Sequence, residues 1–147
     1  AACTLAQKRV GALRVLEGEA SLQRFIENGV RVNSEVNAKL IQSIFSPYTP
    51  LHDGAVIITG GSLAAAACLL PLSERTEVDP ELGTRHRAAI GLTEEFDALV
   101  VVVSEETGTI SVALGGRLIR NLDEETLTTK LKSELGVGKN EDSRTAA

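Results

Sequence analysis

The sequence predicts a single α/β domain, with a mixed, largely antiparallel, twisted central β-sheet flanked by helices. Two observations lead to this fold class. Short apolar runs typical of strands, such as residues 55–59, are interspersed with stretches of helical periodicity. Paired glycines at 60–61 and 115–116 join neighbouring runs as tight hairpins require. We therefore expect one domain over residues 1–135 and a polar, disordered tail at 136–147.

The composition agrees with a packed domain and narrows the class of ligand. The 147 residues are 43% apolar and 24% charged, which is enough to bury a core. A net charge of −5 argues against a nucleic-acid partner, which needs a basic face, but leaves room for a small phosphorylated ligand. Cys3 and Cys68 belong to no CxxC pattern, so we expect idle thiols in a reducing cytoplasm rather than a disulfide or zinc site.

The first half of the chain contains three expected helices and a strand. Residues 2–9 are compatible with a short helix that leads into a strand at 12–16. Ser21 and Gly29 frame a helix at 22–28. The clearest helix has Ser34 as its expected N-cap and ends at the prolines of "SPYTP". Its apolar face consists of Val36, Leu40, Ile41, Ile44 and Phe45.

The second half reads mainly as strands. Apolar runs at 55–59 and 63–69 form a hairpin, and an irregular loop follows at 71–83. A helix starts near Thr84, and the run at 98–104 is the best central strand, buried on both faces. The stretches "TISVAL" and "RLIR" form a second hairpin, and the last helix lies in "DEETLTTKLKSEL", with Leu127, Leu131 and Leu135 on one face. The longest apolar stretch, 63–72, is too short to span a bilayer.

Three polar clusters are candidates for chemistry, and each also has a plain structural interpretation. In "HDG", Asp53 could be a base or metal ligand, His52 a second ligand, and Gly54 a point of close backbone approach. The same three residues also suit an ordinary turn.

In "GTRHRAA", Arg85 and Arg87 occupy a helix start, where the helix dipole disfavours positive charge. A bound phosphate would resolve this conflict, because arginine pairs with phosphate in bidentate fashion. The alternative is a solvated basic turn balanced by Glu94 and Glu95.

In "VSEETG", Ser104, Glu105 and Glu106 follow the central strand, where open sheets bind ligands. A carboxylate at this point could hold Mg²⁺ or Mn²⁺ against phosphates. The alternative is an acidic turn.

Together these stretches are more specific than each alone. "LHDGAVII", "LPLSE", "ELGTRHRAAIG" and "VVSEETG", in this order, resemble the bacterial diadenylate cyclase (DAC) domain, most closely its membrane-anchored type, often called CdaA. The resemblance covers about residues 8–135 and implies the DAC-domain fold. It also implies that two ATP molecules are condensed to cyclic di-AMP, with release of two pyrophosphates, between two subunits that face each other.

The resemblance also implies roles for individual residues. Asp53 would orient or deprotonate the 3′-hydroxyl, and Arg85, His86 and Arg87 would complete the catalytic set by holding phosphates. The metal, Mg²⁺, Mn²⁺ or Co²⁺, would be held by His52, Asp53 and Glu106. Contacts to ATP would come from Gly54, Ala55, Leu69, Leu70, Gly83, Thr84, Ser104 and Glu106. Leu69 departs from the pattern, because relatives often have an aromatic residue there, so adenine stacking would become a plain apolar contact.

The chain opens without Met, so we expect a soluble catalytic fragment of a longer protein at the cytoplasmic face of the bacterial membrane. Contact with the membrane would come only through a missing N-terminal segment, and regulatory protein partners are possible. Two other functions remain open. One is a non-catalytic nucleotide-binding regulatory module, and the other is a metal-dependent phosphohydrolase, which would want more His and Asp ligands than two histidines offer.

Overall fold

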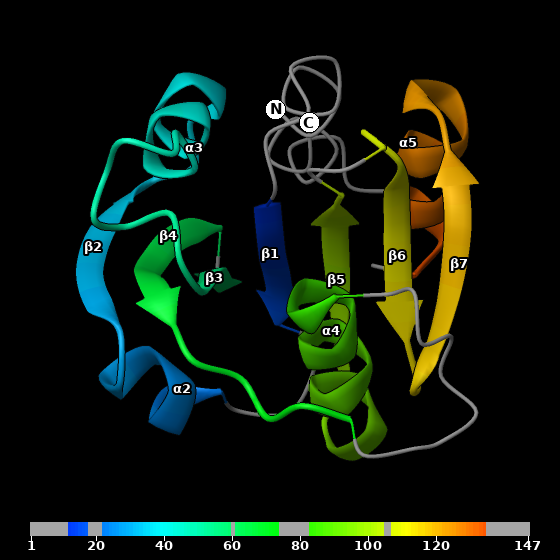
Figure 1. Ribbon diagram of the computed structural model, residues 1–147, viewed down its shortest axis with the longest axis horizontal. Helices are drawn as coiled ribbons and strands as arrows, with labels where there is room; N and C mark the ends of the chain where they lie inside the picture. The colour runs from blue at the N-terminus through cyan, green and yellow to red at the C-terminus, as the bar shows by residue number, and fades with distance from the viewer. Residues whose placement is uncertain (1–11, 18–21, 60, 74–82, 105–106, 135–147) are drawn as a thin grey trace.

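The central element of the fold is one seven-stranded sheet with the strand order β2-β4-β3-β1-β5-β6-β7 (Figure 1). The computed structural model describes residues 12–17 (backbone only), 22–59, 61–73, 83–104 and 107–134. Strands β1 and β3 run parallel, and every other neighbouring pair in the described sheet is antiparallel, which confirms the mixed, largely antiparallel architecture. The strands are β1 Ala12–Glu17, β2 Val30–Glu35, β3 Ala55–Thr59, β4 Ser62–Cys68, β5 Ala98–Val103, β6 Ile110–Leu114 and β7 Arg117–Leu122.

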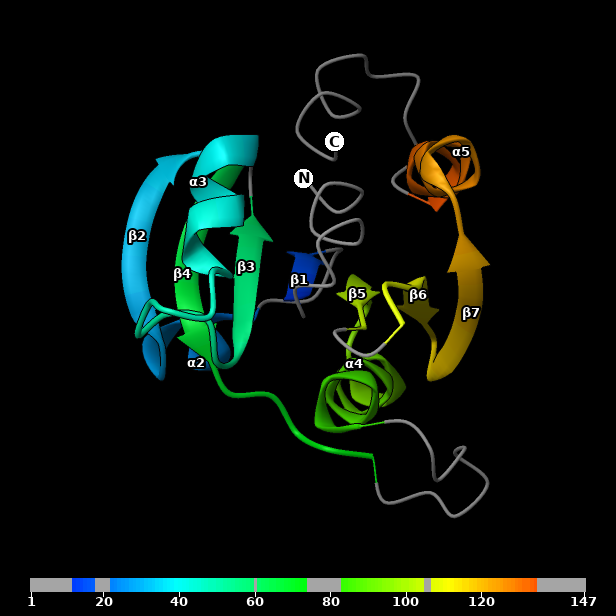
Figure 2. The same cartoon turned by 45° about the horizontal axis from the view of Figure 1, so that its top comes forward.

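Helices cover both faces of the sheet. Helices α3 (Ala38–Ile44) and α5 (Glu124–Glu134) pack on one face, and α2 (Gln23–Glu27) and α4 (Thr84–Glu95) pack on the other (Figure 2). Successive strand residues alternate between these two cores, since side chains along a strand point to opposite faces. Val101 contributes to the α3/α5 core, and Val100 contributes to the α2/α4 core. All six residues of β5 are buried, as expected for a central strand.

Most predicted elements are confirmed. Helix α4 begins at Thr84, and the hairpins β3–β4 and β6–β7 form where the glycine pairs stand. The apolar face expected around Ile41, Ile44 and Phe45 packs into the core, as do Leu127 and Leu131 of α5. The expected helix at 2–9, Ser21, Leu135 and the tail at 136–147 lie outside the described residues.

Two expectations near residue 34 are wrong. Residues Val30–Glu35 form the edge strand β2, and Ser34 lies within it instead of capping a helix. The cap of α3 is Asn37, whose Oδ1 accepts hydrogen bonds from the N–H groups of Lys39 (2.9 Å) and Leu40 (3.1 Å). The strand escaped the sequence pattern because it is an edge strand, largely exposed, with a register shift between Arg31 and Ser34.

The strand register fixes which loops lie at the same end of the sheet. Arg14 of β1 pairs with Val56 of β3 and with Val101 of β5. Two residues earlier in β1, Ala12 pairs with Val103, and the parallel register places Gly54 at the same level on the other side. Neighbouring strands are about 4.8 Å apart, so the backbones of Gly54 and Val103 lie roughly 10 Å apart across β1.

Helix α4 returns the chain to this end. Only Phe96 and Asp97 separate α4 from β5, and the helix packs along the strand (Figure 1). Helix α4 therefore runs antiparallel to β5, with its first turn directed toward the end of the sheet at which β5 ends (Figure 1). Among the described residues, no helix is long and apolar enough to cross a membrane.

Candidate active site

The Asp53–Gly54 turn at the start of β3 is held by a close backbone contact. Gly54 has a φ of +101°, and a Cβ at this position would lie 2.8 Å from both the carbonyl carbon of Ala67 and the carbonyl oxygen of Cys68. The facing strand is irregular here, and Ala67 itself has a φ of +55°. The turn is therefore specified by glycine, and it leaves the Asp53 side chain 87% exposed.

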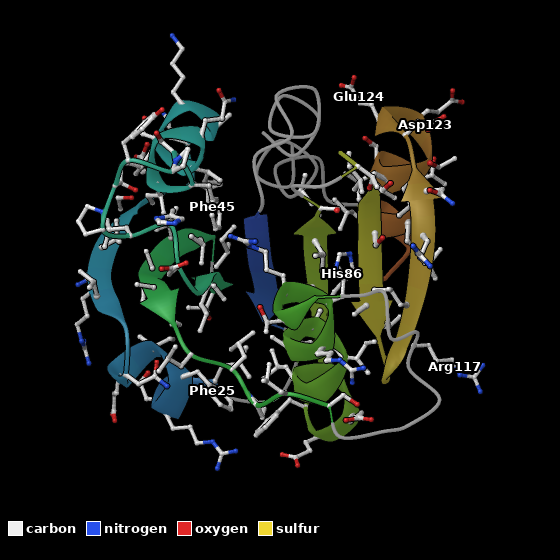
Figure 3. The ribbon with its side chains drawn as sticks, viewed as in Figure 1. Phe25, Phe45, His86, Arg117, Asp123 and Glu124 are labelled. Carbon is white, nitrogen blue, oxygen red and sulfur yellow. The ribbon has the colours of Figure 1, made fainter. Side chains whose placement is uncertain are left out.

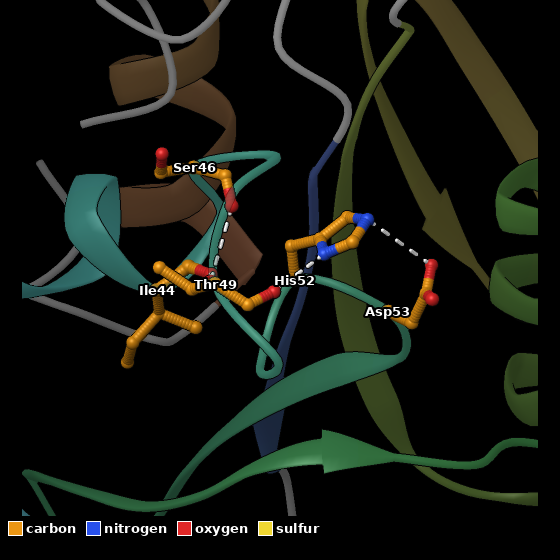
Figure 4. Close-up of polar contacts among 5 residues, drawn as sticks. All are labelled: Ile44, Ser46, Thr49, His52 and Asp53. Carbon is orange, nitrogen blue, oxygen red and sulfur yellow. Dashed lines mark hydrogen bonds and ion pairs between the residues drawn. The ribbon is translucent and has the colours of Figure 1, made fainter.

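His52 and Asp53 form a polar pair beside this turn. The Nδ1 atom of His52 lies 2.8 Å from the carbonyl oxygen of Thr49, and its Nε2 atom lies 3.5 Å from Oδ1 of Asp53 (Figure 4). A carbonyl oxygen can only accept, so Nδ1 carries the hydrogen of this bond. In the neutral ring, Nε2 then presents a lone pair to a carboxylate, which is also an acceptor. A proton or a cation between the two atoms removes this conflict.

These two side chains fit part of a divalent metal site. An imidazole nitrogen and a carboxylate oxygen are ligands of Mn²⁺ and Co²⁺, and the carboxylate also suits Mg²⁺. With bonds of about 2.1 Å, neighbouring ligands of one ion lie roughly 3.0–3.5 Å apart, which agrees with the 3.5 Å between Nε2 and Oδ1. The described residues contain no group of three or more His, Cys, Asp or Glu side chains suited to a metal, and the expected third ligand, Glu106, lies outside the described residues.

The start of α4 is an electropositive helix terminus. Its N-cap residue, Gly83, is extended and forms no side-chain cap, and the first turn contains no acidic residue. Thr84 is exposed, whereas Arg85 and Arg87 are partly buried. The positive end of the helix dipole and two guanidinium groups therefore occupy one turn, which is an arrangement suited to an anion such as phosphate.

His86 lies between these arginines in sequence but occupies a different environment. Its side chain is 7% exposed and points from α4 toward the sheet (Figure 3). Ser111 of β6 is fully buried opposite Val102, a member of the α2/α4 core, and its hydroxyl has no hydrogen-bond partner in the described part of the chain. A buried histidine of α4 and a buried serine of β6 therefore lie on the same face of the sheet, and the sequence pattern did not reveal the contribution of Ser111.

The segment 69–73 follows the end of β4 and contacts α4 through Ser73. The side-chain amide of Asn28 holds the backbone of Leu69 at two points: the Leu69 N–H donates to Oδ1 (2.9 Å), and Nδ2 donates to the Leu69 carbonyl (3.1 Å). The Leu69 side chain is left 69% exposed, while Leu70 packs against the core. Leu69, expected as the last residue of the strand, therefore lies just beyond β4.

Ser73 fastens the other end of this segment. Its N–H donates to the carbonyl of Arg87 (3.0 Å), and its hydroxyl donates to Oε2 of Glu94 (3.2 Å). The Arg87 Nη1 lies 3.5 Å from the Ser73 carbonyl, at the limit of a hydrogen bond. Neither Asn28 nor Ser73 was a sequence candidate, because their partners are distant in the chain.

The structure brings most of the candidate residues to one end of the sheet. Ala55, two residues after Asp53, shares a buried cluster with Ala88, the residue after Arg87. Ser104 follows the end of β5 at the same end, where its N–H donates to the carbonyl of Thr109 (3.0 Å) and closes the turn. The carboxylate and the imidazole before β3 therefore lie at the same end of the sheet as Ser104, and we expect the cationic start of α4 to face this end, an arrangement suited to a phosphorylated ligand with a metal ion.

Comparisons with known proteins place the whole fold in one family. The family model described as DisA bacterial checkpoint controller nucleotide-binding (DAC) matches residues 1–118. The cyclic di-AMP synthase CdaA of Bacillus subtilis strain 168 is 50% identical over 130 residues, which are 88% of this chain and 48% of the relative. A diadenylate cyclase of Listeria monocytogenes is 47% identical over 131 residues, which are 89% of this chain and 48% of the relative.

Two solved structures resemble this chain in fold as well as in sequence. The crystal structure of a double mutant of DacA from Staphylococcus aureus matches with a TM-score of 0.89 at 46% identity, covering 91% of this chain and 89% of that chain. A hypothetical membrane spanning protein from Bacillus cereus matches with a TM-score of 0.79 at 50% identity, covering 83% of this chain and 60% of that chain. This chain spans about half the length of the curated relatives it matches. The resemblance carried by the HDG, TRHR and SEET stretches is thus confirmed, and the chain belongs to the DAC family of nucleotide-binding domains.

Proposed function

We propose that this chain is the catalytic domain of a diadenylate cyclase, which condenses two ATP molecules into cyclic di-AMP and releases two pyrophosphates. The feature that supports the proposal is the combination of an exposed carboxylate at the start of β3 with a cationic helix start on a helix that packs on the same sheet. Both features lie in a chain that is about half identical to proteins named for this activity.

The reaction needs a group that takes a proton and groups that hold charge. In each half-reaction, the 3′-oxygen of one ATP bonds to the α-phosphorus of the other, and the bond to the pyrophosphate oxygen breaks. We assign Asp53 to the 3′-hydroxyl, which it orients and whose proton it accepts. We assign Arg85, Arg87 and the backbone N–H groups of Gly83 and Thr84 to the phosphates, where fixed donors stabilise the charge of the transition state.

The remaining candidates surround the nucleotide in this proposal. Leu69 and Leu70 line the adenine, with Leu69 offering an exposed apolar side chain in place of an aromatic ring. The backbone of Gly54 and Ala55 approaches the nucleotide, and Ser104 lies beside the phosphates. The burial of His86 favours a role in positioning Arg85 and Arg87 over direct contact with phosphate.

A divalent ion completes the site. His52 and Asp53 would hold it together with Glu106, and Mg²⁺, Mn²⁺ or Co²⁺ would suit these ligands. When bound, the ion neutralises negative charge on the phosphates. Substrate phosphates and water would supply its remaining ligands.

The assembly follows from the symmetry of the product. Two ATP molecules must meet with each 3′-hydroxyl facing the other's α-phosphate, so we propose a face-to-face homodimer in which each copy binds one ATP. We also propose that the parent protein is held at the cytoplasmic face of the cell membrane by a segment outside this chain, where regulatory proteins could reach it. The match to a membrane spanning protein supports this location.

The decisive experiment incubates the purified chain with ATP and Mg²⁺, Mn²⁺ or Co²⁺ and identifies the products by mass spectrometry. Cyclic di-AMP supports the proposal. Bound but unchanged ATP would instead indicate a regulatory nucleotide-binding module, and ADP or free phosphate would indicate a phosphohydrolase.

A matched pair of variants tests the assignment of Asp53. Asp53→Asn should retain ATP binding and lower turnover by about 100-fold or more, the range expected for loss of a general base. Asp97→Asn removes the same charge from an exposed position at the opposite end of α4 and should leave turnover close to that of the wild type. Normal turnover of Asp53→Asn would remove this carboxylate from the mechanism.

A further inference from the structure

The loop between α3 and β3 holds the His52 ring through Thr49. The backbone N–H of Thr49 donates to the carbonyl of Ser46 (3.1 Å), and the Thr49 carbonyl accepts from Nδ1 of His52 (2.8 Å). The Thr49 hydroxyl lies 2.7 Å from the carbonyl oxygen of Ile44 and 3.0 Å from that of Ser46 (Figure 4). One residue thus connects the end of α3, the turn and the imidazole ring.

The hydroxyl of Thr49 takes the place of backbone N–H groups, which two residues of this loop lack. Pro47 and Pro50 flank the turn and have no backbone N–H. Ile44 is the last residue of α3, where the final carbonyl groups have no partner within the helix. The partly buried Thr49 hydroxyl shares its one hydrogen between the carbonyls of Ile44 and Ser46, and these contacts hold residue 49 and its backbone carbonyl in place.

The direction of that carbonyl decides which nitrogen of His52 carries hydrogen. With Nδ1–H bound to the Thr49 carbonyl, the lone pair of the neutral ring is at Nε2, which is the nitrogen that lies 3.5 Å from the Asp53 carboxylate. A metal ion needs this lone pair, because a protonated nitrogen cannot bind it. If the ring took the other tautomer, Nε2–H would point at Asp53 and the ion would lose a ligand.

We propose that Thr49 is a positioning residue that holds His52 in the Nδ1–H tautomer and so prepares Nε2 as a metal ligand. This inference rests on the proposed function in one respect, namely that His52 and Asp53 bind a divalent ion. It adds a residue outside the HDG, TRHR and SEET stretches to the site. Thr49 acts on His52 through its hydroxyl and through the turn between Pro47 and Pro50.

The test measures the tautomer and metal binding separately, without ATP. Nitrogen-15 NMR of the imidazole side chains at a pH of about 8.5, where imidazole is ordinarily neutral, reports which nitrogen carries hydrogen. The chain has two histidines, so His52→Gln assigns the resonances. Titration with Mn²⁺, followed by electron paramagnetic resonance, gives the affinity of the site.

The matched variants are Thr49→Val, which keeps the shape and removes the hydroxyl, Thr49→Ser, which restores it, and Ser43→Ala. The hydroxyl of Ser43 donates to the Lys39 carbonyl within α3 (2.9 Å) instead of to the loop that holds the ring, so Ser43→Ala controls for loss of a hydroxyl. We expect Thr49→Val to shift His52 toward the Nε2–H tautomer and to weaken Mn²⁺ binding about 10-fold, the usual effect of losing a residue that orients a ligand. Thr49→Ser and Ser43→Ala should behave like the wild type.

Several outcomes would overturn the inference. They are a wild-type His52 with hydrogen on Nε2, an unchanged tautomer in Thr49→Val, or a shifted tautomer with unchanged Mn²⁺ affinity. The wild-type spectrum decides the first point even if Thr49→Val does not fold. Failure of the wild-type chain to make cyclic di-AMP would overturn the proposed function alone, because neither the tautomer nor Mn²⁺ binding is measured through catalysis.

Discussion

Replacing Gly54 with alanine tests how the Asp53 turn is held. The backbone of Gly54 has a φ of +101°, and a Cβ there would lie 2.8 Å from the Ala67 carbonyl carbon and the Cys68 carbonyl oxygen. Both atoms belong to backbone at the end of β4, so they cannot move aside as a flexible side chain would. Gly61 provides the matched control, since its φ is +78° but nothing lies within 4 Å of the added Cβ.

The two substitutions change the free energy of unfolding through the same contributions, except for the overlap of the new Cβ with backbone atoms of β4, which occurs only at Gly54. A positive φ costs an alanine about 1–2 kcal/mol at either position. Both replacements also stiffen the unfolded chain, which offsets about 0.4–1 kcal/mol. Overlap with packed atoms adds about 1–3 kcal/mol, and only at Gly54. We therefore expect Gly54→Ala to lower the free energy of unfolding by about 3 kcal/mol and Gly61→Ala by about 1 kcal/mol.

Urea unfolding followed by circular dichroism measures both values. In thermal unfolding of a domain of this size, the 2 kcal/mol difference between the two variants corresponds to about 6 °C in Tm. The proposed binding of ATP should also weaken in the Gly54 variant, because relief of the overlap shifts the backbone that carries Asp53. Equal destabilisation of the two variants would refute the reasoning, since it would mean that β4 yields to the added methyl group.

Three further predictions follow from individual groups. Asp123 caps α5, and the N–H and hydroxyl of Thr126 hold its pKa below the ordinary 3.8. Because the folded-state pKa is the lower one, the carboxylate stabilises the fold at pH values above 3.8, and this stabilisation is lost as pH falls through the lowered pKa. The stability difference between the wild type and Asp123→Ala, measured by urea unfolding across pH, should therefore shrink in acid, and a difference that does not change with pH would contradict this. Burial raises the pKa of the Cys68 thiol to about 11, so iodoacetamide at neutral pH should modify Cys68 only after denaturation, and mass spectrometry that finds it modified in the folded chain would contradict this. Ser111→Ala removes a buried hydroxyl without a partner in the described structure, so it should leave the free energy of unfolding unchanged or raise it by up to about 1 kcal/mol; a loss beyond 1 kcal/mol would mean that the hydroxyl has a partner.

Elements with strong local patterns were predictable from the sequence. The apolar run of β5 and the start of α4 at Thr84 lie where expected, because a fully buried strand and a long helix impose their periods on consecutive residues. The edge strand β2 was not predictable, because exposed strands carry polar residues and the bend near Asn33, with its φ of +51°, breaks the alternation.

The candidate site also contains features that the sequence reveals and features that it does not. The residue types at Asp53, Arg85 and Arg87 indicate phosphate and metal chemistry from the sequence alone, since a carboxylate after a loop and arginines at a helix start are local features. The matching family model describes nucleotide binding, which agrees with the phosphate part of that interpretation. The burial of His86 among these residues was not visible, because burial depends on which side of α4 meets the sheet.

By itself, the sequence determined the fold class, the principal strands and helices, and the identity of the charged groups, because these depend on neighbours a few residues apart. Only the tertiary structure decided which nitrogen of His52 meets Asp53 and how Asn28 holds Leu69, 41 residues away. A hydrogen bond depends on distance and direction in space, and residues that are remote in sequence acquire these only when strand register and helix packing bring them together.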